Sequence, residues 1–116
     1  MSEAAGSRPS RALAEYRRSL APETEQAFLE FSRRAFADGA LPARTKEIIA
    51  VAVAHVTQCP WCIRGHAGAA MRKGVTEQEI MEAIWVAAEM RAGAAFAHSA
   101  LAMAELKHDP QASLAG

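Results

Sequence analysis

The sequence lacks the features that mark nucleic-acid-binding, secreted or membrane-spanning proteins. Its 13 Lys and Arg residues balance its 13 Asp and Glu residues, so no net charge attracts nucleic acid or an anionic membrane surface. The first residues contain neither a basic nor an apolar segment, and charged residues such as Glu82 and Arg91 interrupt the longest helix-like stretches. These absences predict a cytoplasmic protein with no secretion signal and no membrane span.

Cysteine is scarce, and the chain is short. There are two cysteines among 116 residues, and a domain of this size buries roughly 65% of the surface that its unfolded chain exposes. The chain can therefore fold without disulfide or metal staples. We expect a flexible N-terminal segment over residues 1–10, a single helical domain over 11–108 and a C-terminal tail over 109–116.

Alanine, in contrast, is abundant, with 28 copies. Because Ala is the best helix former and is depleted in strands, this composition favours an all-α fold. Apolar residues recur at helical spacing over several segments. These are residues 11–20, 22–39, 41–57, 59–73 and 76–108. Gly74 is placed to end the fourth segment.

Two local signals organise the last of these segments. Thr76 and Glu79 form a Thr-x-x-Glu capping box at its start. Gly93 is expected to break or bend it, so that a last helix follows. Between them, residues 80–90 are apolar on nearly every side. A helix that is apolar on more than one face is buried on more than one face, which predicts a homo-oligomer.

The segment before the cysteines permits two interpretations. Residues 48–53 read Ile-Ile-Ala-Val-Ala-Val, a run that would suit a buried strand. A strand followed by Cys-x-x-Cys would be typical of a thioredoxin-like fold. The pattern, however, extends over about fifteen residues, which is the length of a helix, and no other segment supplies partner strands. We therefore predict a helix, with the thioredoxin-like fold as the alternative.

The most informative stretch is Cys59-Pro60-Trp61-Cys62 followed by His66. Cysteines three apart in a first helical turn lie within disulfide range, and the positive end of the helix dipole favours thiolates there. Cys62 and His66 are one turn apart on the same face, so the imidazole can exchange a proton with the thiol. This arrangement predicts a redox-active dithiol.

Two alternatives remain open for these residues. Free cysteines are often buried and inert, so the pair can be packing residues beside an unrelated histidine. The spacing Cys-x2-Cys-x3-His also offers three soft metal ligands. Structural zinc sites use four ligands, however, and the chain has no second cysteine pair.

Glu47 completes a longer pattern. The spacing is eleven residues from Glu47 to Cys59, two from Cys59 to Cys62, and three from Cys62 to His66. This pattern resembles the Glu-x11-Cys-x-x-Cys-x-x-x-His signature of the alkyl hydroperoxidase D branch of the carboxymuconolactone decarboxylase superfamily. The resemblance covers about residues 41–106. It implies a small orthogonal bundle of about five to six helices that assembles as trimers or hexamers.

The resemblance also implies a chemistry. It suggests a thiol peroxidase or disulfide reductase in which Cys62 attacks a hydroperoxide, Cys59 resolves the sulfenic acid, and Glu47 and His66 relay the proton. The expected reductant is a lipoyl-bearing or thioredoxin-like partner, with no cofactor and no metal. From the residues alone, the more N-terminal Cys59 is equally a candidate for the activated thiol, because it lies nearest the helix end.

The chain departs from the family pattern at one position. Well-known members have a histidine between the cysteines where this chain has Trp61, so any help from that group is absent or supplied elsewhere. Decarboxylase members lack the cysteine pair, and its presence here argues against lactone decarboxylation. The rival functions are a decarboxylase-like enzyme, a general disulfide reductase and a non-catalytic oligomer that senses oxidation.

Overall fold

The fold is entirely helical. The computed structural model describes residues 9–108, and within them the chain forms five helices and no strand. They are α1 (Arg11–Leu20), α2 (Pro22–Phe36), α3 (Ala43–Thr57), α4 (Pro60–Arg72) and α5 (Glu77–Lys107). The all-α prediction is confirmed, and the stretch that resembled a strand lies inside α3. Residues 1–8 of the predicted flexible segment and the whole predicted tail, 109–116, lie outside the described residues.

Local signals set most helix ends. Gly74 has a φ of 84°, a left-handed conformation that Gly adopts without strain, and the Val75 N–H donates to Ala70 O at 3.0 Å. The predicted end of α4 is therefore confirmed. Helix α2 ends at Phe36, three residues before the predicted end of this segment at residue 39. Beyond it, Asp38 Oδ1 accepts a hydrogen bond from the Ala43 N–H at 2.6 Å, which holds this stretch as the connector to α3.

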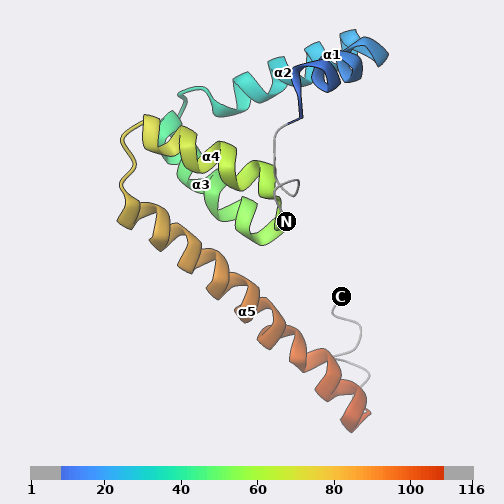
Figure 1. The fold of residues 1–116 in the computed structure, drawn as a ribbon. Coiled ribbons are helices and arrows are strands. Elements are labelled where there is room, and N and C mark those ends of the chain that lie inside the picture. Colours follow the sequence, from blue (N-terminus) through green and yellow to red (C-terminus); the bar gives the residue numbers. More distant parts are fainter. Residues whose placement is uncertain (1–8, 109–116) are drawn as a thin grey trace.

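The prediction that Gly93 interrupts the last helix is wrong. Helix α5 runs unbroken through Gly93 for 31 residues, as Figure 1 shows. A single Gly inside a helix costs only about 1 kcal/mol relative to Ala. Ala92, Ala94 and Ala95 surround this position, and these strong helix formers offset that cost.

The start of α5 is fixed by the predicted capping box. Thr76 Oγ1 accepts from the Glu79 N–H at 3.1 Å, and Glu79 Oε1 accepts from the Thr76 N–H at 2.9 Å. Arg44, on α3, donates to the same Glu79 carboxylate and to Gly74 O. The capping box therefore also ties α5 to α3.

We expect Thr76→Ala to lower the free energy of unfolding by about 1 kcal/mol, because it removes the acceptor for one helix-end N–H. Urea denaturation monitored by circular dichroism measures this change. Thr76→Ser is the control, since it keeps the hydroxyl and should stay close to the wild-type stability. A Thr76→Ala protein as stable as the wild type would mean that the cap contributes nothing.

A small core holds α3, α4 and α5 together. Val51, Ala70 and Val75 are buried at its centre, and Ile48, Ile80 and Ile84 pack around them. Helix α4 folds back along α3, while α5 crosses the pair and extends well beyond it (Figure 1). The hairpin of α3 and α4 is thus the best-supported part of the fold.

The single chain is unusually open. Its radius of gyration is 19.3 Å, whereas a compact domain of this length has about 13 Å. Large apolar side chains are left in solvent, among them Trp85 at 65% exposure and Phe96 at 81%. Within residues 9–108, no helix has both the length and the apolar character needed to cross a membrane. The predicted cytoplasmic location stays a prediction.

Candidate active site

The two cysteines lie at the turn between α3 and α4. Gln58 ends α3 in a left-handed conformation with a φ of 58°, and the Cys59 N–H donates to Ala54 O at 3.2 Å. This tight turn makes Cys59 the N-cap of α4, where its Sγ accepts a hydrogen bond from the Cys62 N–H at 3.3 Å. Pro60 occupies the first helical position, which needs no N–H donor.

The pKa values of the two thiols are shifted in opposite directions. Hydrogen bonds from the Cys62 side chain, and then from the backbone N–H groups of Cys62 and Trp61, hold the pKa of Cys59 below its usual value. Donation to Cys59, burial and the neighbouring charge of Cys59 raise the pKa of Cys62. Both cysteines are free thiols in the structure. In the resting reduced protein, Cys59 is therefore the more readily ionised sulfur.

This difference predicts the order of alkylation. Only the thiolate reacts, so the rate follows the thiolate fraction. As the pH falls, Cys59, with its lowered pKa, should keep reacting with iodoacetamide at values where Cys62 has stopped. Peptide mass spectrometry at several pH values measures both rates in one sample. Faster alkylation of Cys62 at neutral pH would contradict the assignment.

Glu47 and His66 form a pair across α3 and α4, in which Glu47 is buried and His66 is partly exposed. Glu47 is only 6% exposed, and its Oε1 lies 2.7 Å from Nδ1 of His66. Because a carboxylate can only accept, Nδ1 carries the proton and Nε2 is left as the ring acceptor. The sequence spacing therefore located a real contact between residues 19 positions apart.

Sequence reasoning did not find Phe36 as part of the site. Its ring stacks on the His66 imidazole, with centroids 4.9 Å apart and planes 18° from parallel. Phe36 is the last residue of α2, and in the sequence it is one of several apolar residues at helical spacing, which gave no sign of this contact. The stacking fixes the ring that Glu47 also holds.

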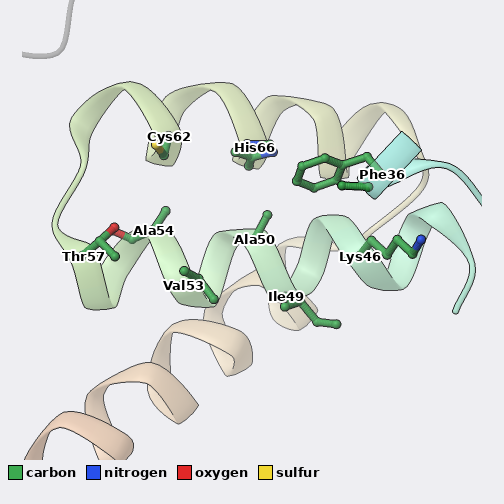
Figure 2. A pocket seen from close by; sticks show the side chains of 10 residues that line it. Phe36, Lys46, Ile49, Ala50, Val53, Ala54, Thr57, Cys62 and His66 are labelled. Atoms are coloured by element: carbon green, nitrogen blue, oxygen red, sulfur yellow. The ribbon is translucent and has the colours of Figure 1, made fainter. Parts of the chain in front are cut away.

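Cys62 and His66 open into an apolar pocket of about 420 Å³ between α3, α4 and the end of α2. Figure 2 shows both side chains on α4, facing the α3 wall. The other lining residues are Ala35, Phe36, Lys46, Ile49, Ala50, Val53, Ala54 and Thr57. Cys59 is not among the lining residues, so Cys62 is the sulfur that faces a molecule in the pocket.

Other candidate ligands lie apart from this pocket. His55 Nδ1 is 2.8 Å from Val51 O, so that histidine is satisfied within its own helix. Across residues 9–108, no group of three or more His, Cys, Asp and Glu side chains is arranged to hold a metal ion. The geometry therefore offers no support for the alternative of a zinc site.

Comparison with known proteins identifies the family of the chain. The family model described as carboxymuconolactone decarboxylase matches residues 22–106. The chain belongs to this family. The match includes α2, α3 and α4, the three helices that line the pocket, and nearly all of α5. The family model identifies the carboxymuconolactone decarboxylase family as a whole and does not distinguish its branches. The resemblance to the alkyl hydroperoxidase D branch rests on the spacing of Glu47, the two cysteines and His66.

Relatives in this family are similar over most of their length. An uncharacterised protein of Paracoccus denitrificans, protein 4 in the cox locus, is 67% identical over 82 residues, covering 71% of this chain and 74% of that protein. An uncharacterised protein of Cupriavidus necator is 37% identical over 83 residues, covering 70% of this chain and 74% of that protein. A crystal structure from Methanobacterium thermoautotrophicum matches with a TM-score of 0.67 and 37% identity, covering 70% of this chain and 91% of that one.

Proposed function

We propose that the protein is a thiol-dependent peroxidase that reduces hydroperoxides through Cys62 and Cys59. The observation that carries the proposal is that Cys62 and His66 line one apolar pocket, and that Glu47, outside the lining, holds His66 by a hydrogen bond. A pocket of this volume lies in the range that small organic molecules occupy. A thiol, a hydrogen-bonded imidazole and an apolar wall are the groups that an organic hydroperoxide needs.

The first step is proton transfer and attack. The raised pKa of Cys62 leaves it largely protonated, so it needs a base. His66 Nε2 takes the thiol proton, directly or through one water, while Glu47 stabilises the resulting imidazolium. The sulfur then attacks the outer peroxide oxygen: an S–O bond forms, the O–O bond breaks, and the alkoxide takes the proton from His66 and leaves as an alcohol.

The second step closes the dithiol. The Cys59 sulfur, whose lowered pKa favours its thiolate, attacks the Cys62 sulfenic acid: an S–S bond forms and the S–O bond breaks. The leaving hydroxide takes a proton from solvent, equal to the one that the Cys59 thiol gave up, and becomes water. An external dithiol, lipoyl-bearing or thioredoxin-like, then restores both thiols by exchange. The different acidities suit these roles, because Cys62 is activated only beside its base, while Cys59 is ready to resolve.

Turnover in the presence of a dithiol tests this function. Reduced protein, cumene hydroperoxide and dihydrolipoamide are mixed, and peroxide loss is followed with time. Catalytic loss of peroxide at sub-stoichiometric protein supports the proposal. Peroxide loss no faster than with dihydrolipoamide alone would overturn it, and the family's decarboxylase chemistry or a sensing role would then be the better account.

We also propose that the protein works as a homo-oligomer, a trimer or hexamer. Support comes from α5, whose described exposed residues include Trp85, Met90, Phe96 and Leu106. So many large apolar side chains exposed along one helix would be buried where a second copy packs on it, since large exposed apolar surface marks interfaces. An assembly would also bury apolar surface that the open shape of the single chain leaves exposed to solvent.

Size-exclusion chromatography with light scattering measures the assembly. We expect a mass several times that of one chain, and we expect Phe96→Glu to shift it toward the monomer. Because Phe96 is 81% exposed in the single chain, this change leaves the fold of that chain intact. Gln78→Glu is the control, since it adds the same charge at an exposed polar position of α5. A monomeric wild type would refute the assembly, and a different mass after oxidation would favour the sensing role.

A further inference from the structure

The pocket has one cationic end. Its α3 wall is made mostly of small and apolar residues, Ile49, Ala50, Val53 and Ala54, and it has Lys46 at one extreme and Thr57 at the other. The Thr57 hydroxyl donates to Ala54 O at 3.3 Å, so its donor is already used. Lys46 is therefore the one charged group on this wall.

The Lys46 ammonium is held in place by one hydrogen bond and has N–H donors left for a ligand. Its Nζ donates to Ala37 O at 2.6 Å, which fixes the half-buried side chain against the loop between α2 and α3. An ammonium has three N–H donors, so two remain. None of the ion pairs formed within residues 9–108 involves Lys46. A fixed cation with free donors beside an apolar wall attracts an anion that carries an apolar chain.

The spacing of Lys46 and Cys62 along the pocket, measured as helix rise on α3, indicates the length of that chain. Figure 2 shows Cys62 opposite Ala54, with Lys46 at the far end of the pocket beyond His66. Lys46 and Ala54 are eight residues apart on α3, which is about 12 Å along a helix. An extended chain covers 3.3–3.6 Å for every three bonds, so roughly ten bonds span this distance.

We propose that the preferred substrate is a carboxylate-terminated aliphatic hydroperoxide, and that Lys46 binds its carboxylate. This proposal rests on the peroxidase function proposed above. The carboxylate pairs with Lys46, the alkyl chain lies along Ala50 and Val53, and the hydroperoxide at the other end reaches Cys62. The reaction is unchanged: the hydroperoxide becomes an alcohol, the two thiols become a disulfide, and one water is released. Lys46 thus determines specificity without touching the reacting atoms.

A matched acid and ester test this assignment. The probes are ω-hydroperoxydecanoic acid, which has the length derived above, and its methyl ester, which has the same chain and peroxide without the charge. We expect the wild type to use the acid with a kcat/KM about tenfold higher than the ester, because hydrogen bonds to charged groups are worth this much. Equal use of acid and ester would overturn the proposal.

Variants at Lys46 assign the preference to this residue. Lys46→Met keeps the chain length and removes the charge, so the ratio of kcat/KM for the acid to kcat/KM for the ester should fall about tenfold, to near one. Lys46→Arg restores a cation and should restore most of the preference. Thermal unfolding of both variants shows whether loss of the bond to Ala37 O has loosened the loop. If Lys46→Met lowered acid and ester equally while folded, its role would be structural and the proposal would fail.

Binding of a non-reacting probe separates this proposal from the peroxidase function. Calorimetry with decanoate and decanol reads the pocket without any thiol chemistry. Tighter binding of decanoate that is lost in Lys46→Met supports the anion site even if no peroxide is consumed, in which case only the peroxidase function fails. Peroxidase activity on cumene hydroperoxide with no preference for decanoate would leave that function standing and overturn the Lys46 site.

Discussion

Cys62→Ser is expected to lose hydroperoxide turnover by at least about a thousandfold, since removing a nucleophile costs this much or more in enzymes. Serine keeps nearly the same shape, so the pocket between α3 and α4 should persist. The loss follows because Cys62 is the sulfur that lines the pocket beside His66. Peroxide consumption with dihydrolipoamide as reductant measures it.

Cys59→Ser is the matched variant, and it should fail differently. Its Cys62 can still attack once, but no thiol captures the sulfenic acid. Dimedone should therefore label residue 62 in Cys59→Ser after one equivalent of hydroperoxide, and peptide mass spectrometry locates the adduct. Turnover retained by Cys62→Ser, or labelling of Cys59 in that variant, would reverse the assigned roles.

His66→Leu is expected to lower both stability and rate. The change leaves the buried Glu47 carboxylate without its hydrogen-bond partner, which costs about 1–3 kcal/mol for a buried polar group. It also removes the base for Cys62, and loss of general base catalysis costs about 10²–10⁴-fold in rate. Urea denaturation and peroxide consumption measure the two effects on one preparation.

Glu47→Gln separates these two effects. Its amide oxygen can still accept from His66 Nδ1, so we expect a stability loss of only about 1 kcal/mol. The neutral amide does not stabilise an imidazolium, so the rate should still fall well below that of the wild type. If Glu47→Gln were as active as the wild type, the pair would be a structural contact and not a proton relay.

Much of the fold followed from local signals. The Thr76 capping box and the Gly74 turn act within a few residues of themselves, so the sequence predicts the helix ends they set. Gly93 shows the limit of such signals. Whether a single glycine ends a helix depends on its neighbours, and here the surrounding alanines keep the helix intact. The end of α2 was also misplaced: Ala37 is already extended, and Asp38 bonds to the first residue of the next helix.

The candidate site was only partly predictable. Glu47 and His66 could be paired because a known spacing linked them, and the two helices do bring them within 2.7 Å. Phe36 and Lys46 could not be assigned in this way. In the sequence, Phe36 resembles any apolar residue of α2, and Lys46 resembles any solvated charge of α3. Only the packing of the end of α2 against α3 and α4 places both residues around the pocket.

The exposed apolar surface of α5 also could not be assigned from the sequence. The run over residues 80–90 predicted burial on more than one face, yet α5 packs mainly on α3 within a single chain, and residues such as Trp85 remain exposed. Periodicity reports that a face is apolar but not which molecule covers it. The assembly therefore has to be measured in solution.

The first half-reaction tests the central claim most directly. Reduced wild-type protein is treated with one equivalent of cumene hydroperoxide, quenched with acid and analysed by intact and peptide mass spectrometry. The account predicts a mass lower by two hydrogen atoms, with a disulfide that joins Cys59 to Cys62 and one cumyl alcohol formed for each chain. Free thiols at both positions and unconsumed hydroperoxide would contradict it.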